Sequence, residues 1–323
     1  MPVQVNSPAV LELVDEDAEL ERLGTGFTFT EGPLWNPDGF LLFSDMPGDV
    51  RRRWDADSGV TEVANPSNKG NGMTFDLDGK LIVCEHVTSS VVRMDPDGTG
   101  ANREVIASHY GDKELNAPND VVVRSDDTIW FTDPLFGING EWEGSRAKPE
   151  QATTNVYRIS PDGKLRAVIT DIFNPNGLAF SPDEKKLYVV EWRGTPNRSI
   201  WSLDISAEGE ASNKTKLVDA ADFGALDGFK VDRDGNLWCG YGSNGALNTE
   251  PNDVGGRKVF TLKGKPEDLD GVMVFNPQGK PVGFIRLPER CANLCFGGPK
   301  NNRLYMTSSH SLYALYVEAH GAV

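Results

Sequence analysis

The sequence lacks the features that mark disulfide-stabilised, secreted and membrane-spanning proteins. Only four of its 323 residues are cysteines, and no two of them form a Cys-x-x-Cys pair. No segment approaches the ~18–20 consecutive apolar residues of a membrane-spanning helix. The N-terminal residues MPVQVNSPAVLELVDEDAELERL contain no basic stretch followed by an apolar one, as a secretory signal would. These absences predict a reduced, cytoplasmic protein.

Positive charge is also scarce. The chain has 32 Lys+Arg against 48 Asp+Glu, which gives a formal net charge of −16. Nucleic acids and anionic membranes are bound through clustered Lys and Arg. The sequence therefore predicts neither as a partner, and a small molecule is the expected ligand.

Several catalytic and nucleotide-binding motifs are missing. There is no HExxH metalloprotease helix, no GxxxxGK[ST] phosphate loop and no GxSxG nucleophile elbow. Long amphipathic helices are absent as well, and the 34 glycines and 20 prolines favour short strands joined by turns. The composition is thus typical of an all-β chain.

A repeated pattern organises most of the chain. In each copy a carboxamide or carboxylate opens a short apolar strand, a turn follows, and a second apolar strand returns. The opening residues are separated by 40, 48, 57, 51 and 66 positions. The six copies are EGPLWNPDGFLLFSD (31–45), NGMTFDLDGKLIVCE (71–85), NDVVVRSDDTIWFTD (119–133), NGLAFSPDEKKLYVVE (176–191), DGFKVDRDGNLWCGY (227–241) and NLCFGGPKNNRLYMTSS (293–309).

Two further strand-like segments separate consecutive copies, so each unit of about 50 residues supplies four strands. Six such units predict a single-domain six-bladed β-propeller over residues 1–323. We expect residues 1–20 to form an N-terminal extension. Residues 21–30 should complete the last blade beside 311–319 and close the ring, which removes a free sheet edge. The pairs Asp38-Gly39, Asp78-Gly79 and Asp234-Gly235 predict type I′ hairpin turns.

The opening residue of each copy is polar, and all six begin an innermost strand. They should therefore face the central channel near one end, where two carboxylates and four amides suit a divalent cation or a polar ligand. An alternative is that Asn and Asp before Gly are simply turn residues. The six openers are Glu31, Asn71, Asn119, Asn176, Asp227 and Asn293.

A second row of polar residues ends the returning strands, namely Asp45, Glu85, Asp133, Glu191 and Tyr241. Its acids lie either on a solvated rim or around the channel mouth. His86 follows Glu85 and is a candidate substrate contact. Residues 133–151 are polar and glycine-rich, which indicates a long loop at the rim where substrates arrive.

Four motifs occur in order along the chain: EGPLW, NAPNDVVV with WFTDP, NPNGLAFSPDEKKLYVVEW, and LDGFKVDRDGNLW. Together they resemble the SMP-30/gluconolactonase/luciferin-regenerating-enzyme family, and NAPND with the chain length resembles its bacterial gluconolactonase branch. The resemblance implies a six-bladed propeller that hydrolyses sugar lactones with one divalent cation. Ca²⁺ is the expected ion, with Zn²⁺, Mn²⁺, Mg²⁺ and Fe²⁺ as alternatives.

The resemblance also implies residue roles. Glu31, Asn176 and Asp227 would be direct metal ligands, Asn119 would bind metal or substrate, and Asp227 would be the catalytic acid and base. Animal members carry a substrate-contacting arginine where this chain has Ala117. We expect Asn71, Glu85 and His86 to hydrogen-bond the sugar.

Two other functions fit the same pattern. One is a hydrolase for a phosphotriester, an aryl ester or a non-sugar lactone on the same scaffold. The other is a non-enzymatic calcium-binding module.

Overall fold

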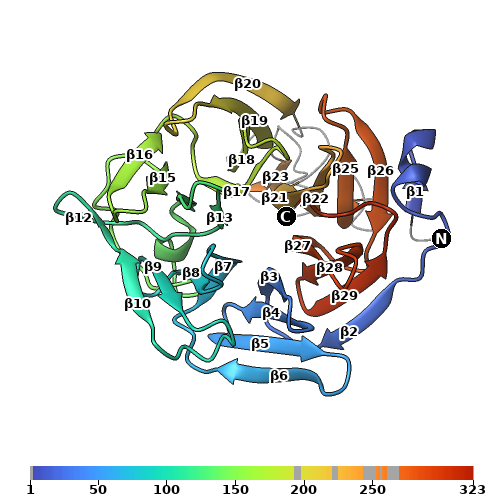
Figure 1. The fold of residues 1–323 in the computed structure, drawn as a ribbon, viewed down its shortest axis with the longest axis horizontal. Coiled ribbons are helices and arrows are strands. Elements are labelled where there is room, and N and C mark those ends of the chain that lie inside the picture. Colours follow the sequence, from blue (N-terminus) through green and yellow to red (C-terminus); the bar gives the residue numbers. More distant parts are fainter. Residues whose placement is uncertain are drawn as a thin grey trace.

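The computed structural model describes residues 3–192, 198–219, 225–242, 252–254, 257–259 and 269–322. These residues form antiparallel sheets arranged in a ring, with one strand of each sheet nearest the centre (Figure 1). Six of the sheets contain four or five strands. The predicted six-bladed β-propeller is therefore confirmed.

The first three blades follow the chain from the innermost strand outward. Blade 1 contains β3 (Thr30–Asn36), β4 (Phe40–Asp45), β5 (Val50–Asp55) and β6 (Gly59–Ala64). Blade 2 contains β7 (Gly70–Phe75), β8 (Leu81–Glu85), β9 (Ser90–Met94) and β10 (Glu104–Ala107). Blade 3 contains β13 (Val121–Val123), β14 (Ile129–Asp133), β15 (Asn155–Ile159) and β16 (Leu165–Ile169).

The last three blades repeat this order. Blade 4 contains β17 (Pro175–Phe180), β18 (Lys186–Trp192), β19 (Arg198–Ile205) and β20 (Ala211–Asp219). Blade 5 contains β21 (Ala225–Val231), β22 (Leu237–Gly242), β25 (Gly271–Phe275) and β26 (Pro281–Arg286). Blade 6 contains β27 (Cys291–Gly297), β28 (Arg303–Ser308), β29 (Ser311–Tyr316) and, outermost, β2 (Glu21–Thr25).

Shorter elements lie outside this pattern. They are the hairpins β11 (His109–Tyr110) with β12 (Lys113–Glu114) and β23 (Asn252–Val254) with β24 (Arg257–Val259), and the 3₁₀ turns η1 (Pro8–Glu12) and η2 (Phe136–Ile138).

The N-terminal region closes the ring. β2 pairs antiparallel with β29, with Glu21 opposite Ala314 and Thr25 opposite Ser311. The first and last parts of the chain thus share blade 6, as the sequence predicted, and the sheet edge of that blade is covered. In addition, β1 (Val3–Val5) pairs with β26 and adds a fifth strand to blade 5.

The hydrophobic core lies between neighbouring blades. In the described part of the chain, the buried apolar residues divide into six clusters, each joining two adjacent blades. One example is the cluster that contains Leu41 and Phe43 of blade 1 with Tyr305 of blade 6. Because successive side chains of a strand point to opposite faces, every blade packs against both neighbours, and this holds the innermost strands in a ring.

The hairpin turns differ in type from the prediction. A type I′ turn needs positive φ at both central residues, yet only the glycine of each Asp-Gly pair has one, as at Gly39 with φ +96°. The Gly39 N–H instead donates to the carbonyl of Asn36, whose side chain accepts from the Asp38 N–H. The polar residue two positions before Asp thus fixes the turn through its side chain, and the type I′ prediction was wrong.

The four cysteines are unpaired and buried. Within the described residues, no helix has the length and apolar character needed to cross a bilayer.

Candidate active and metal site

The six opening residues meet at one end of the ring axis. Five of them lie in the innermost strands β3, β7, β17, β21 and β27, and Asn119 directly precedes Asp120 and β13. All six are buried, with exposed fractions between 3% and 7%. Asn71, Asn176 and Asp227 lie inside strands and have no positive φ. The alternative of simple turn residues therefore fails at these three positions.

Glycines let the neighbouring inner strands approach closely enough to form this ring. The Gly72 N–H donates to the carbonyl of Asn119 at 2.8 Å, and a Cβ on Gly72 would lie 2.6 Å from that oxygen. A Cβ on Gly228 would lie 2.0 Å from the side-chain Cγ of Asn293. The glycine after an opening residue is thus needed because the next blade occupies the space of a side chain.

Direct hydrogen bonds join four of the openers in two pairs, each pair from neighbouring blades. The Asn176 Nδ2 donates to Asp227 Oδ1 at 2.6 Å, from blade 4 to blade 5. The Asn293 Nδ2 donates to Glu31 Oε2 at 3.1 Å, from blade 6 to blade 1. Residues up to 262 positions apart in sequence therefore share one polar site.

The two carboxylates repel each other in this buried place. Burial, and next the negative charge of Asp227, raise the pKa of Glu31 to about 8. Hydrogen bonds from the Gly32 N–H and Asn293 oppose the rise. Two buried like charges are stable together only if a proton or a cation compensates them. A positive charge bound at this site would therefore stabilise the two carboxylates in their ionised form.

The donor atoms suit a hard divalent cation. Carboxylate oxygens of Glu31 and Asp227 and the amide oxygen of Asn176 come from three different blades, and the buried opener Asn119 carries a further amide oxygen. In the described part of the chain, no three His, Cys, Asp or Glu side chains meet as a metal cluster. A cation held here would consequently complete its shell with amide oxygens and water, which Ca²⁺ and Mg²⁺ accept readily.

Arg290 supplies the positive charge that meets Asp227 in this structure. Its guanidinium pairs with Asp227 Oδ2 and lies over the ring of Phe29, 5.4 Å from the centroid. Arg290 comes from the loop between β26 and β27, three residues before the opener Asn293. The sequence interpretation missed it, although its position next to an opener was a usable signal.

The buried residue Ala117 contributes no side chain to recognition. Its N–H donates to Asp133 Oδ1 at 2.9 Å, which fixes the loop before β13. An arginine is nevertheless present at this end of the axis, because Arg290 reaches it from the loop between blades 5 and 6.

The rim loop places a further carboxylate beside these groups. Glu143 is largely buried, and burial followed by the charge of Asp227 raises its pKa, while Arg290 lowers it. Trp142, next to it, is 60% exposed. The sequence identified residues 133–151 as a rim loop but gave no reason to select Glu143.

His86 ties this loop to blade 2. Its Nδ1 lies 2.8 Å from the backbone oxygen of Glu143, so Nδ1 carries the proton and donates it. The other nitrogen, Nε2, faces Asn71 Nδ2 at 3.4 Å. Burial lowers the pKa of His86 to about 4, so the ring is neutral and its Nε2 is an acceptor.

Asp120, which the sequence interpretation also missed, lies just below the openers. Its side chain is 2% exposed and Oδ1 accepts from the Val121 N–H at 2.9 Å. Burial raises its pKa, and the ammonium of Lys230 is the largest opposing influence.

The second row of acids is buried and does not lie on a solvated rim. Asp45, Glu85, Asp133 and Glu191 are at most 4% exposed. Asp133 accepts the N–H groups of Asn116 and Ala117, and Asp45 accepts those of Thr28 and Phe29. These carboxylates hold the loops that enter the blades, so the solvated-rim interpretation was wrong.

Glu85 is occupied by other side chains. Arg103 donates to both of its oxygens, at 2.9 and 2.7 Å, and Asn68 and Thr88 donate to Oε2. The structure thus places Glu85 in a structural network rather than with the openers.

Comparison with known proteins gives consistent matches over nearly the whole chain. Residues 29–310 match the model of the SMP-30/gluconolactonase/LRE-like region. A gluconolactonase of Zymomonas mobilis is 30% identical over 339 aligned positions, which cover 98% of this chain and 86% of that protein.

Two solved structures illustrate the similarity. A gluconolactonase from Xanthomonas campestris is 31% identical, with a TM-score of 0.83 over 98% of this chain and 95% of that one. A calcium-binding regucalcin from Agrobacterium tumefaciens is 19% identical, with a TM-score of 0.71 over 94% of this chain and 95% of that one, and shares the fold.

Proposed function

The chain belongs to the SMP-30/gluconolactonase/LRE-like family, and from that premise we propose that it hydrolyses sugar lactones of the aldonolactone type with the help of one divalent cation. Opening a lactone ring breaks a carboxylic ester, so the protein is a carboxylic ester hydrolase. The observation that supports the proposal most strongly is the meeting of Glu31, Asn176 and Asp227 from three blades in one buried polar site.

Glu31, Asn176 and Asp227 would hold the cation directly, and Asn119 would contribute its amide oxygen to the cation or its N–H to the substrate. Ca²⁺ is the first candidate because every donor is an oxygen. When bound, such a cation polarises the lactone carbonyl and lowers the pKa of a coordinated water. The remaining steps depend on side chains of this chain.

Asp227 acts as the base and then as the acid. One of its oxygens removes a proton from water as the water oxygen forms a bond to the carbonyl carbon. The bond from that carbon to the ring oxygen then breaks, and Asp227 returns the proton to the departing oxygen. The products are the open-chain acid and its hydroxyl group, with Asp227 restored.

Substrate hydroxyls find both donors and acceptors around this point. The neutral Nε2 of His86 accepts, the Asn71 amide accepts and donates, and the guanidinium of Arg290 donates. Arg290 thereby supplies the positive contact that Ala117 lacks. Glu85 takes no part, because Arg103 binds both of its oxygens.

Asp227→Asn tests the proposal against a matched variant, Asp234→Asn, which changes an exposed hairpin carboxylate. Hydrolysis of glucono-δ-lactone is followed with a pH indicator after EDTA treatment and after addition of Ca²⁺, Zn²⁺, Mn²⁺, Mg²⁺ or Fe²⁺ singly. We expect Asp227→Asn to lose at least about a hundredfold in kcat, with Asp234→Asn unchanged. Full turnover by Asp227→Asn, or undiminished activity of the wild type in EDTA, contradicts the mechanism.

The substrate class is tested in the same assay. Xylonolactone and gluconolactone should be hydrolysed, whereas paraoxon and aryl esters should be poor substrates. A reversed preference would favour the general esterase or phosphotriesterase. Cation binding without hydrolysis of any substrate would favour the non-enzymatic calcium-binding module.

The location of the protein stays a prediction. Four buried, unpaired cysteines are typical of a reducing compartment, and we propose the cytoplasm.

A further inference from the structure

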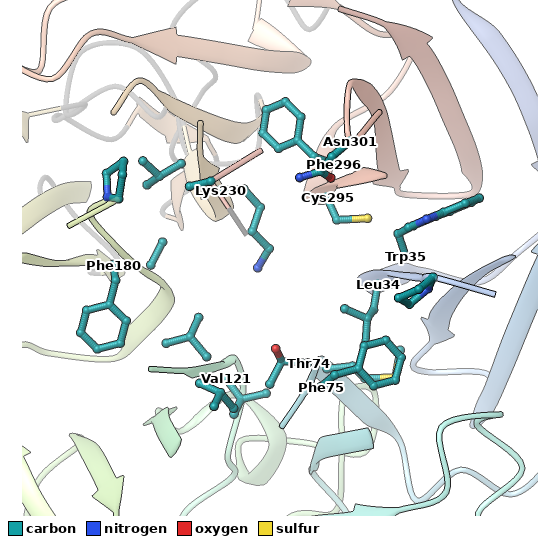
Figure 2. A pocket seen from close by; sticks show the side chains of 18 of the residues that line it. Leu34, Trp35, Thr74, Phe75, Val121, Phe180, Lys230, Cys295, Phe296 and Asn301 are labelled. Carbon is teal, nitrogen blue, oxygen red and sulfur yellow. The ribbon is translucent and has the colours of Figure 1, made fainter. Parts of the chain in front are cut away.

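A cavity of about 660 Å³ lies at the end of the innermost strands opposite the openers. It is lined by the continuation of β3, β7, β13, β17, β21 and β27 beyond the openers (Figure 2). Exposed turn residues such as Gly39 and Pro182 form part of its wall, so the cavity opens to solvent on this side. Its size falls in the range of about 300–1,000 Å³ that is usual for small-molecule sites.

The wall of this cavity is apolar at all but a few positions. The residue three places after each opener lines it, which gives a ring of one residue per blade. In order of the blades, these residues are Leu34, Thr74, Val122, Ala179, Lys230 and Phe296. Lys230 is the charged member, in the place that the other blades fill with apolar residues or threonine.

Lys230 extends toward the middle of the cavity (Figure 2). Among the described residues it forms no ion pair within 4 Å and no side-chain hydrogen bond, and it is half-buried. An ammonium group that has no hydrogen-bonded counter-ion beside apolar walls would be stabilised by a bound anion.

Two carboxylates face the Lys230 region, and both have other partners. Asp120 lies above the cavity, where its Oδ1 accepts from the Val121 N–H. Glu184 lies in the wall and is held by Ser125 and Arg124. Neither carboxylate forms an ion pair with the Lys230 ammonium within 4 Å, although Asp120 and this ammonium attract each other at longer range.

We propose that this cavity binds a hydrophobic monocarboxylate, with the carboxylate at the Lys230 ammonium and the hydrocarbon body against the apolar ring. A cation would be repelled by Lys230, and a sugar would leave most of its hydroxyls without partners on these walls. The site is separate from the lactone site, because the two lie at opposite ends of the same strands.

Decanoate and its neutral counterpart decanol are suitable probes, measured by titration calorimetry on the full-length protein. Wild type should bind decanoate saturably at one site. Lys230→Met should weaken decanoate binding by about tenfold or more, since the charge-assisted contact is lost. Decanol binding should not change. Lys185→Met is the matched control, because that exposed lysine pairs with Asp183 and does not line the cavity.

A second measurement does not depend on a variant. A diazirine derivative of decanoate should label peptides that contain the cavity residues around Val122 and Phe296, and excess glucono-δ-lactone should not reduce the labelling. Thermal unfolding of Lys230→Met without ligand checks that it is folded.

The proposal is overturned by absence of saturable decanoate binding to wild type at millimolar concentration. Equal decanoate affinity of a folded Lys230→Met protein, or labelling confined to the lactone end of the channel, also overturns it.

Discussion

Replacing His86 with asparagine should remove a defined part of the pH dependence of stability. In the folded protein the His86 ring donates from Nδ1 to the Glu143 carbonyl and is almost completely buried. Burial, and to a smaller extent the charge of Lys69, lower its pKa from the ordinary 6.5 to about 4. In the unfolded chain the same ring takes up a proton at about pH 6.5.

The sign follows from proton uptake. Below pH 6.5 the unfolded chain binds a proton at His86 that the folded protein excludes until about pH 4. The His86 contribution to the free energy of unfolding is therefore lost as the pH falls through this window. The complete loss amounts to about 3 kcal/mol, of which about 2 kcal/mol falls between pH 7.5 and 5.

Other buried groups act in the opposite direction. Burial raises the pKa of Asp133 to about 7 and that of Glu31 to about 8, so these carboxyls favour the folded state as the pH falls. The wild-type profile alone therefore does not isolate His86. The informative quantity is the difference in free energy of unfolding between wild type and variant at each pH.

Urea unfolding of the EDTA-treated protein at pH 5, 6, 6.5, 7 and 7.5 measures that quantity. The destabilisation caused by His86→Asn should be about 2 kcal/mol smaller at pH 5 than at pH 7.5. His109→Asn, which changes an exposed ring, should run parallel to wild type. Parallel profiles for wild type and His86→Asn would refute the assignment of a neutral, buried His86.

Three further predictions concern the axis site. Arg290→Met should raise the affinity for a divalent cation by about tenfold, because a competing positive charge is removed from Asp227, and it should increase KM for the lactone. Weaker cation binding of this variant in calorimetry would contradict the prediction. Gly228→Ala should destabilise the protein by about 1–3 kcal/mol and weaken cation binding, since its Cβ has no space, whereas Gly140→Ala, which has open space, should do neither. Glu85→Gln should lower the free energy of unfolding by about 1–3 kcal/mol and leave KM for the lactone unchanged. A higher KM of this variant in steady-state assays would show that Glu85 does contact the substrate.

Much of the fold was predictable because it is encoded locally and then repeated. Each copy carries the same order of opener, strand, turn and strand, so a departure from the pattern in one copy does not hide it in the others. The place where the chain closes its ring was predictable for the same reason, since the last copy lacks an outer strand that residues 21–25 supply. The shared register also put Glu31, Asn176 and Asp227 at one end of the axis.

Prediction from the sequence failed where the role of a residue depends on contacts between copies of the repeat. Asp45, Glu85, Asp133 and Glu191 recur in the repeat as regularly as the openers do, and their sequence pattern does not distinguish a rim from an interior. Only the tertiary structure showed that they are buried and bonded to neighbouring groups. The turn type was missed because it depends on a side-chain acceptor two residues before Asp.

The sequence by itself thus determined the six-bladed ring, its closure and the set of polar residues that face the axis, because strand periodicity and repeat register are properties of short segments. The tertiary structure decided which charges meet. The charged groups concerned come from loops and strands that are distant in sequence: Arg290 beside Asp227, Glu143 above them, and Lys230 in the opposite cavity. Only the packing of the blades sets the distances on which their electrostatic interactions depend.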